Sequence, residues 1–288
     1  MTLACTVAGI TFSNPILLAS GTAGYGRELG GMMQLDRLGG LVTKAVSLAP
    51  RPGNRAPRVA EFRGGMLNSV GLANPGVDRV RRDELPWLAR EIPALRVIVN
   101  VVGFTLTEYA EVIARLDDLD GHVAYELNLS CPNTSAGGVE FGADPDAIRA
   151  VVSSCRAATQ RPIFVKMSPA LPDIPALVEA ARDAGADGAS LVNTLPGMIY
   201  HGGKPRLGNG FGGISGPALL ASGILAVSRV SARCPDFPLI GVGGVRTVAD
   251  VQDYQRAGAS LVAIGTAALA DPRLPERIID ALPGHHHG

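Results

Sequence analysis

Eight short runs of apolar and β-branched residues recur along this chain, and helical patterns separate them. The runs cover residues 16–19, 40–45, 97–102, 125–130, 163–167, 189–194, 239–243 and 261–266. Between them, stretches such as 108–116 place apolar residues on one face at helical spacing. Strands that alternate with helices predict a parallel sheet. Eight of them within 288 residues predict a single (β/α)8 (TIM) barrel domain over residues 1–288.

A doubly wound sheet is the main alternative to the barrel. It is expected to carry a G-x-G-x-x-G fingerprint after an early strand. The early turn Gly21-Thr22-Ala23-Gly24-Tyr25-Gly26 has a different spacing, which favours the barrel. Two long stretches rich in Gly, Pro and Asn, 50–77 and 196–217, are expected to be irregular loops over the barrel mouth.

Capping signals mark several helix ends. Asp144-Pro145 predicts an N-cap followed by proline at the first helical position. In 182–186 and 255–259, Ala-Gly-Ala follows a helical pattern and precedes a strand, which predicts helices closed by glycine. A further helix is expected to begin near Thr247.

Charge and cysteine content argue against several classes of protein. The 26 basic and 26 acidic residues balance, unlike the footprint of a nucleic-acid-binding protein. No apolar run reaches transmembrane length and the N-terminus has no signal-peptide pattern, so we expect a cytoplasmic protein with no membrane partner. The four cysteines contain no C-x-x-C pair, so we expect no metal and no iron–sulfur site in this chain. The run His285-His286-His287 is either native or a tag remnant, and it is left out of that expectation.

Polar residues gather at the carboxyl ends of the predicted strands, where the active sites of barrels lie. These ends carry Ser20, Lys44, Asn100, Asn128, Cys131, Lys166, Asn193, Thr194, Gly243, Gly244, Gly265 and Thr266. Only three of the 26 basic residues are lysines, and two of them, Lys44 and Lys166, lie in this set. A structural ion pair is the simpler alternative for either lysine. Their shared setting favours functional ammonium groups.

The glycines at the last two strand ends indicate a phosphate site. Loops after the seventh and eighth strands of a barrel, with exposed backbone N–H groups and a helix N-terminus, commonly bind phosphate. Glycine permits close approach of the backbone to the anion. Combined with Lys44 and Lys166, the site suggests flavin mononucleotide (FMN). A phosphorylated sugar substrate remains the alternative that these residues alone leave open.

The segment 128–133 reads Asn-Leu-Ser-Cys-Pro-Asn at the end of the fourth predicted strand. Its two amides offer paired donors and acceptors to a small planar ligand. The thiol between them could act as a base or as a nucleophile. Its place among the other polar strand ends argues against a buried core cysteine and leaves both the base and the nucleophile open.

Several motifs, in order along residues 5–270, resemble those of the dihydroorotate dehydrogenase family. They are N-L-S-C-P-N at 128–133, L-N-S-V-G-L at 67–72 with N-P-G at 74–76, V-K-M-S-P at 165–169, N-T at 193–194, G-I-S-G-P at 213–217 and G-V-G-G at 241–244. Cys131 resembles class I, because class II members carry serine there. The sequence N-P-G-V-D at 74–78 resembles the NAD-linked type B more than the fumarate-linked type A.

The resemblance implies a flavoenzyme that oxidises (S)-dihydroorotate to orotate in de novo pyrimidine (UMP) biosynthesis. Cys131 would remove the C5 proton while C6 delivers hydride to the flavin. One FMN per chain would be held by Ser20, Lys44, Ala45, Asn100, Asn128, Lys166, Val192, Gly216, Gly243, Gly244, Gly265 and Thr266. Dihydroorotate would be held by Lys44, Asn68, Ser69, Val70, Gly71, Leu72, Asn128, Asn133, Asn193 and Thr194.

The resemblance to type B also implies a separate subunit that carries FAD and a 2Fe–2S cluster and passes electrons to NAD⁺. A homodimer of this chain would then sit within a heterotetramer. Two enzymatic alternatives are a fumarate-linked class I enzyme and a dehydrogenase of another dihydropyrimidine. A flavin-free, phosphate-binding scaffold subunit is the alternative from a different class.

Overall fold

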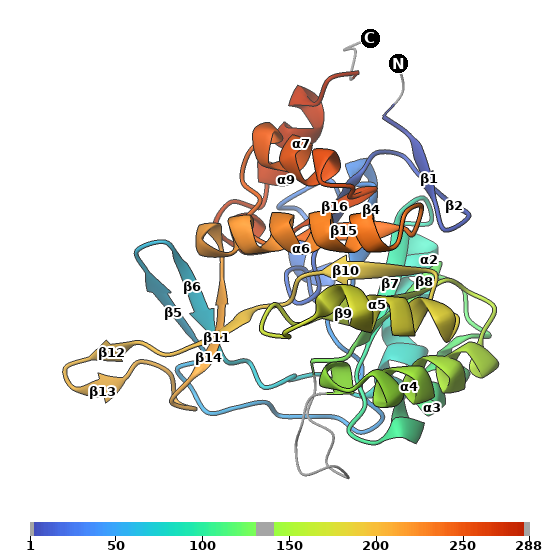
Figure 1. The fold of residues 1–288 in the computed structure, drawn as a ribbon, viewed down its shortest axis with the longest axis horizontal. Helices are drawn as coiled ribbons and strands as arrows, with labels where there is room; N and C mark the ends of the chain where they lie inside the picture. Colours follow the sequence, from blue (N-terminus) through green and yellow to red (C-terminus); the bar gives the residue numbers. More distant parts are fainter. Residues whose placement is uncertain (1–2, 131–140, 285–288) are drawn as a thin grey trace.

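The computed structural model describes residues 3–130 and 141–284, and its centre is a closed barrel of eight parallel strands (Figure 1). The strands follow one another around the barrel in chain order, and the last pairs with the first. They are β3 (Ile16–Leu18), β4 (Gly40–Val42), β7 (Arg96–Val101), β8 (Ala124–Asn128), β9 (Ile163–Met167), β10 (Gly188–Leu191), β15 (Leu239–Val242) and β16 (Leu261–Ile264). The predicted (β/α)8 barrel is confirmed.

Alternation along the strands produces two apolar cores. Outward side chains such as Leu41 pack under the helices, and inward ones such as Val42 fill the barrel. The antiparallel hairpin of β1 (Cys5–Val7) and β2 (Ile10–Phe12) adds Val7 and Phe12 to the inner core. Because Phe12 lies just before β3, the hairpin covers the amino-terminal end of the barrel. The carboxyl end is thus left for a ligand.

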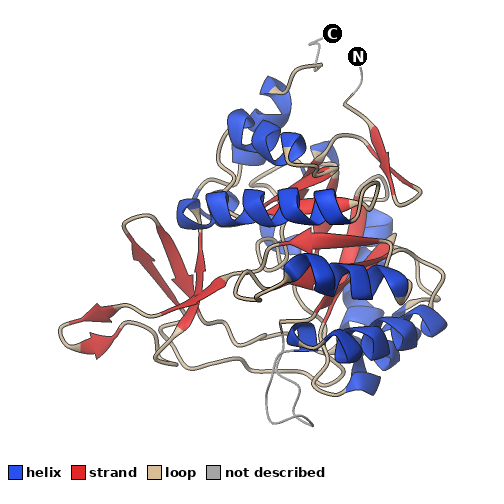
Figure 2. Cartoon of the chain, in the orientation of Figure 1, coloured by secondary structure: helices blue, strands red, loops and turns tan. Residues whose placement is uncertain are grey.

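Helices surround the strands (Figure 2). The longer ones are α2 (Leu85–Glu91), α3 (Leu106–Leu116), α4 (Pro145–Ala158), α5 (Ile174–Asp183), α6 (Leu220–Arg233), α7 (Val248–Arg256) and α9 (Leu274–Ala281). The shorter ones are α1 (Val77–Arg79), which a π-helical turn at Val80–Glu84 continues, and α8 (Thr266–Ala270). Turns of 3₁₀ helix occur at Arg27–Leu29, Leu35–Arg37, Phe141–Ala143 and Pro217–Leu219. None of the described helices has the length and hydropathy needed to cross a bilayer.

The predicted helix ends agree with the structure. Asp144 caps α4, because its side chain accepts a hydrogen bond from the Asp146 N–H at 3.0 Å. Thr247 caps α7 in a reciprocal capping box with Asp250. Gly185 and Gly258 follow α5 and α7 with φ of 103° and 113°, a conformation that glycine adopts at little cost.

Several strands end earlier than predicted. The predicted strands 40–45 and 189–194 stop at Val42 and Leu191. The predicted strand 261–266 stops at Ile264, because Thr266 is the first residue of α8. Beyond these ends, the N–H groups of Thr43, Val192 and Asn193 still donate to carbonyls of the neighbouring strands, at Ile98, Val242 and Met167. The backbone bonding of the barrel therefore continues into its mouth.

The expectation of two irregular loops is wrong. Segments 50–77 and 196–217 contribute most of a four-stranded antiparallel sheet, in the order β11 (Leu195–Gly197), β14 (Gly212–Ser215), β6 (Gly65–Asn68), β5 (Val59–Phe62). A small hairpin of β12 (Tyr200–His201) and β13 (Lys204–Pro205) extends from it. This sheet lies beside the barrel, to the left in Figure 1. Its central pairing joins Ser215 to Met66, residues too far apart in sequence for local patterns to predict.

Candidate active site

Polar side chains occupy one half of the barrel interior. Asn100, Glu126, Lys166 and Ser190 come from four consecutive strands, β7 to β10, and each is at most 6% exposed. The strand register sets Asn100 beside Glu126 and Lys166 beside Ser190. The inner core contains aliphatic side chains of β15, β16, β3 and β4, namely Val242, Ala263, Leu17 and Val42. It also contains Ile98, Ala124 and Phe164, two residues earlier on β7, β8 and β9, so the interior is polar only towards the carboxyl ends of the polar strands.

Glu126 joins the members of this polar layer. Its Oε1 accepts a hydrogen bond from Asn100 Nδ2 at 2.6 Å, and its Oε2 accepts one from the Ser190 hydroxyl at 2.6 Å. The Lys166 Nζ lies 3.7 Å from Oε1. Neither Glu126 nor Ser190 was among the predicted site residues. The signal that could have revealed Glu126 is an acidic residue two positions before Asn128, on the same inward face of an apolar strand.

Asn100, a predicted flavin ligand, is fixed through its backbone N–H and its side-chain NH₂ group. Its backbone N–H donates to Thr43 Oγ1 at 3.1 Å, and its side-chain NH₂ is taken by Glu126. The carbonyl Oδ1 is buried and has no partner among the described residues. A buried acceptor without a partner is costly unless a ligand donates to it.

Asn128 and Asn193 meet at the mouth as predicted. Asn193 Nδ2 donates to Asn128 Oδ1 at 3.4 Å, and Asn193 Oδ1 accepts from the Thr194 N–H at 2.8 Å. The Tyr109 hydroxyl donates to the backbone carbonyl of Asn128 at 2.9 Å, which fixes the end of β8. The adjacent Val192 N–H donates to Val242 O at 2.9 Å, after a cis peptide bond between Leu191 and Val192.

The loop 68–72 reaches the same end of the barrel. Asn68 Nδ2 donates to the carbonyl of Gly213 at 3.2 Å, where the two halves of the antiparallel sheet meet. Leu72 packs against Ala45 and Val102, just beyond β4 and β7. Gly71 has φ of 72°, and a Cβ there would lie 2.6 Å from Asn54. The predicted substrate loop is therefore anchored on strand ends that also carry predicted flavin ligands.

The lysines differ in their surroundings. Lys166 is buried beside Glu126, as described above. Lys44 is half-buried, its backbone N–H donates to Gly24 O at 2.7 Å, and its ammonium forms no ion pair with any described carboxylate. The nearby Ser20 hydroxyl donates to Thr43 O at 2.8 Å. Lys204 is exposed on β13, away from the strand ends of the barrel.

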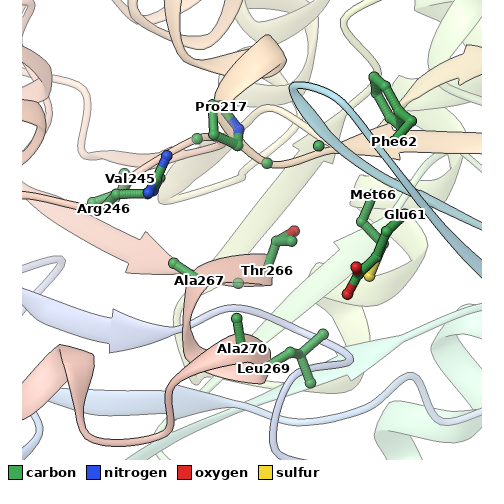
Figure 3. A pocket seen from close by; sticks show the side chains of 14 residues that line it. Glu61, Phe62, Met66, Pro217, Val245, Arg246, Thr266, Ala267, Leu269 and Ala270 are labelled. Carbon is green, nitrogen blue, oxygen red and sulfur yellow. The ribbon is translucent and has the colours of Figure 1, made fainter.

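A cavity of about 330 Å³ opens where the glycines were predicted to bind phosphate (Figure 3). Gly216, Gly244, Gly265 and Thr266 line it, together with the side chains labelled in the figure. Gly244 has φ of 77°, and a Cβ there would lie 2.6 Å from Leu220 Cβ, so only glycine fits. Gly243 is next to the cavity, and its carbonyl accepts a hydrogen bond from the Tyr254 hydroxyl at 2.8 Å.

Backbone donors are available in this cavity. At the start of α7, the N–H groups of Arg246 and Thr247 are taken by the Asp250 carboxylate, both at 2.9 Å. The N–H groups of Gly244 and Val245 donate to no acceptor in the described part of the chain. An anion in this cavity would therefore be bound through the glycine turn rather than through the helix N-terminus.

Two predicted site residues, Cys131 and Asn133, lie outside the described residues, as does the run 285–287. Within 3–130 and 141–284, no three His, Cys, Asp or Glu side chains gather as a metal site.

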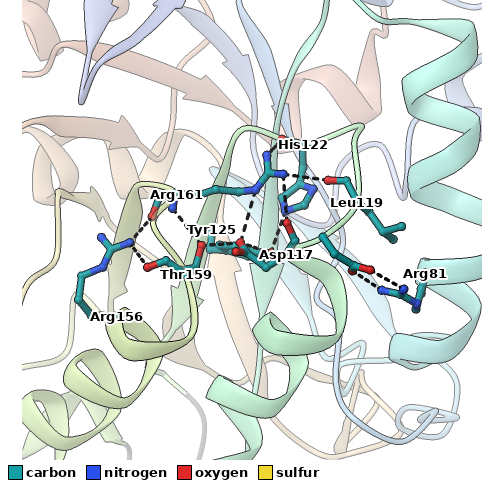
Figure 4. Close-up of polar contacts among 9 residues, drawn as sticks. Arg81, Asp117, Leu119, His122, Tyr125, Arg156, Thr159 and Arg161 are labelled. Carbon is teal, nitrogen blue, oxygen red and sulfur yellow. Dashed lines mark hydrogen bonds and ion pairs between the residues drawn. The ribbon is translucent and has the colours of Figure 1, made fainter.

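A second polar cluster lies at the amino-terminal end of β8 (Figure 4). The Tyr125 hydroxyl donates to Asp117 Oδ1 at 3.2 Å and contacts His122 Nε2 at 2.8 Å. Thr159 also donates to Asp117, and Arg161 to the His122 carbonyl. Burial, and then the charge of Arg161, lower the pKa of His122 to about 3. The cluster lies at the opposite end of β8 from Asn128 and joins helix ends to strands, so we assign it a structural role.

Comparisons with known proteins agree with this geometry. A family model described as dihydroorotate dehydrogenase matches residues 2–285. The catalytic subunit of dihydroorotate dehydrogenase B (NAD(+)) from Pelobacter propionicus is 44% identical over 279 residues, covering 96% of this chain and 90% of its own. The Desulforudis audaxviator subunit of the same name is 46% identical over 272 residues, covering 93% and 87%. A solved structure of DHODH from Eimeria tenella with ferulenol matches the fold, with a TM-score of 0.79 at 22% identity over 96% of this chain and 82% of its own.

Proposed function

The chain belongs to the dihydroorotate dehydrogenase family, and we propose that it oxidises (S)-dihydroorotate to orotate in de novo pyrimidine biosynthesis, as the catalytic subunit of an NAD⁺-linked enzyme. One observation carries the proposal. The polar half of the barrel, with Asn100 and Lys166, opens at the same end as the Asn128–Asn193 pair and the glycine-lined cavity. That end can hold a flat polar ring and a phosphate together.

The residues present fit FMN, the flavin on which this family in general depends. The buried acceptor Asn100 Oδ1 suits an N–H of the ring, and the free amides of Gly244 and Val245 suit the phosphate. The residues that would hold FMN are Ser20, Lys44, Ala45, Asn100, Asn128, Lys166, Val192, Gly216, Gly243, Gly244, Gly265 and Thr266. When bound, FMN supplies the hydride acceptor.

The chain's own residues would bind dihydroorotate and move its proton. The substrate residues are Lys44, Asn68, Ser69, Val70, Gly71, Leu72, Asn128, Asn133, Asn193 and Thr194. The ammonium of Lys44, which no described carboxylate contacts, suits the substrate carboxylate, and the amides suit its ring N–H and C=O groups. Cys131, outside the described residues, would accept the C5 proton as the C6 hydride leaves, which forms the C5=C6 bond of orotate.

A second, electron-transfer subunit is part of the same proposal. The relatives named above are catalytic subunits, which implies a second subunit in their enzymes. We propose that this chain holds one FMN in a single barrel domain. Its homodimer would join two partner subunits that carry FAD and a 2Fe–2S cluster.

An acceptor assay tests the function. The purified chain should be yellow with FMN, and dihydroorotate should bleach the flavin band. Reduction of NAD⁺ should then require the partner subunit. Turnover with fumarate in the absence of a partner would assign the chain to the fumarate-linked type instead. A colourless protein that gains no absorbance on adding FMN would contradict any flavin-dependent function.

A further inference from the structure

We propose that Glu126 is a positioning residue for the flavin reaction, which orients Asn100 and supplies the counter-charge of the buried Lys166 ammonium. This inference rests on the proposed function. Glu126 is 1% exposed and lies on β8, on the same inward face as Asn128. No other described carboxylate contacts the polar half of the barrel interior.

Glu126 decides which way the Asn100 amide faces. A carboxylate can only accept hydrogen bonds, so the Asn100 atom 2.6 Å from it must be the NH₂ nitrogen. The other end of the amide, Oδ1, is then turned away from Glu126 and has no described partner. An acceptor is thus presented to the flavin site, where a freely rotating amide would present either end.

Glu126 also supplies the counter-charge of Lys166. The 3.7 Å distance from Nζ to Oε1 is an ion pair, and no hydrogen bond joins the ammonium to a described acceptor. Lys166 is 6% exposed, so Glu126 rather than water balances its charge.

A purely structural role explains this arrangement less well. The rest of the barrel interior is filled by apolar side chains such as Val242, Ala263 and Phe164, so closure of the barrel needs no charge. Replacing a buried ion pair by packed apolar residues is often neutral or stabilising. The pair lies at the end of the barrel where the ligands are proposed to bind.

Glu126→Gln separates charge from hydrogen bonding. Glutamine can accept from Asn100 with Oε1 and donate to the Ser190 hydroxyl with Nε2, so both contacts can persist. Only the counter-charge of Lys166 is lost.

The readout is the midpoint potential of bound FMN, measured with reference dyes across neutral and alkaline pH. The unbalanced ammonium should raise the potential of Glu126→Gln above that of the wild type, because an uncompensated positive charge favours the reduced flavin. A tenfold change in the equilibrium constant of reduction corresponds to about 30 mV for a two-electron couple.

Glu84→Gln is the matched control, because Glu84 is also buried and paired with arginines, but lies outside the barrel. Its potential should follow the wild type at every pH. If the potential of Glu126→Gln also follows the wild type, the inference is wrong while the proposed function stands.

If Glu126→Gln does not fold, Glu126→Asp replaces it. This variant retracts the carboxylate by one methylene and should shift the potential the same way, by less; an unchanged potential overturns the inference. Wild-type protein that binds no FMN would contradict the proposed function itself.

Discussion

The partners that a polar side chain already has decide what it can offer a ligand. Asn193 uses both ends of its amide within the chain, on Asn128 and on the Thr194 N–H. Asn128 uses its carbonyl oxygen, and its NH₂ group donates to no described residue. Asn100 uses its NH₂, so its carbonyl oxygen remains. The mouth therefore presents a donor from β8 and an acceptor from β7, the complement of a ring that carries both N–H and C=O groups.

Lys166→Ala should weaken FMN binding roughly ten- to hundredfold, the scale of a lost charged hydrogen bond of about 1.5–3 kcal/mol. It also leaves the buried Glu126 without its cation. Titration of the apoprotein with FMN, followed by flavin fluorescence, measures the change. Lys204→Ala, at an exposed position on β13, is the control and should bind FMN as the wild type does. Equal losses in both variants would mean that the scarcity of lysine carried no functional information.

Cys131→Ala should keep FMN and lose most reductive turnover, by roughly 10²- to 10⁴-fold, the range for a general base. In the wild type, flavin reduction by dihydroorotate should accelerate as the pH rises, because the thiolate is the base. Stopped-flow absorbance at the flavin band measures both effects. A Cys131→Ala variant that reduces its flavin at the normal rate would remove this residue from the mechanism.

At the scale of elements, local sequence patterns predicted what depends on neighbours along the chain. The eight strands and the caps at Asp144 and Thr247 depend on local composition, and all were found. The sheet of β11, β14, β6 and β5 was missed. Its central β14–β6 pairing joins two distant segments, whereas its β5–β6 hairpin is local. The site residues likewise fall into those that local sequence predicted and those that it missed. Lys44, Asn100 and Asn128 stand out at strand ends, whereas Glu126 and Ser190 lie deeper in strands and are recognised only once those strands close into a barrel.

His122, just before β8, should make the free energy of unfolding fall in acid. The ordinary pKa of histidine is 6.5, and that of His122 in the fold is about 3. As the pH falls below 6.5, His122 binds a proton in the unfolded chain but not in the folded chain. The free energy of unfolding therefore falls by up to about 1.4 kcal/mol per pH unit. Urea unfolding at several pH values should show a shallower slope for His122→Gln. His201→Gln, at an exposed position on β12, should keep the wild-type slope, and identical slopes in all three proteins would contradict the prediction.

The turn after β15 should tolerate no side chain at Gly244. Gly244→Ala places a Cβ 2.6 Å from Leu220 at a φ of 77°, so it should destabilise the fold and weaken FMN binding. Gly210→Ala is the matched control, because Gly210 has a φ of 87° but open space around it. It should cost only the backbone term of about 1–2 kcal/mol and leave FMN affinity unchanged. Thermal unfolding and FMN titration of both variants separate the two effects, and equal FMN affinities would count against a phosphate site at this turn.

At the scale of the whole molecule, the barrel is closed at one end and built for a ligand at the other. The β1–β2 hairpin completes the apolar core at the amino-terminal end with Val7 and Phe12. At the opposite end, three kinds of group have no partner among the described residues: a buried acceptor on Asn100, the ammonium of Lys44 and the amides of Gly244 and Val245. These groups lie on different strands, from β4 round to β15. A ligand that satisfies them all must therefore link opposite sides of the barrel.

FMN should consequently stabilise the whole barrel, and its phosphate should account for part of the effect. FMN at a hundred times its Kd adds about 2.7 kcal/mol, if it binds only the folded chain. For a chain of this size that corresponds to a rise in Tm of roughly 5–10 °C. Riboflavin has the same ring but no phosphate for the glycine-lined cavity, so at equal concentration it should raise Tm less. Thermal unfolding of the apoprotein with each ligand measures the difference. Equal shifts in Tm would mean that the phosphate contributes no binding energy, which would contradict a phosphate site in this cavity.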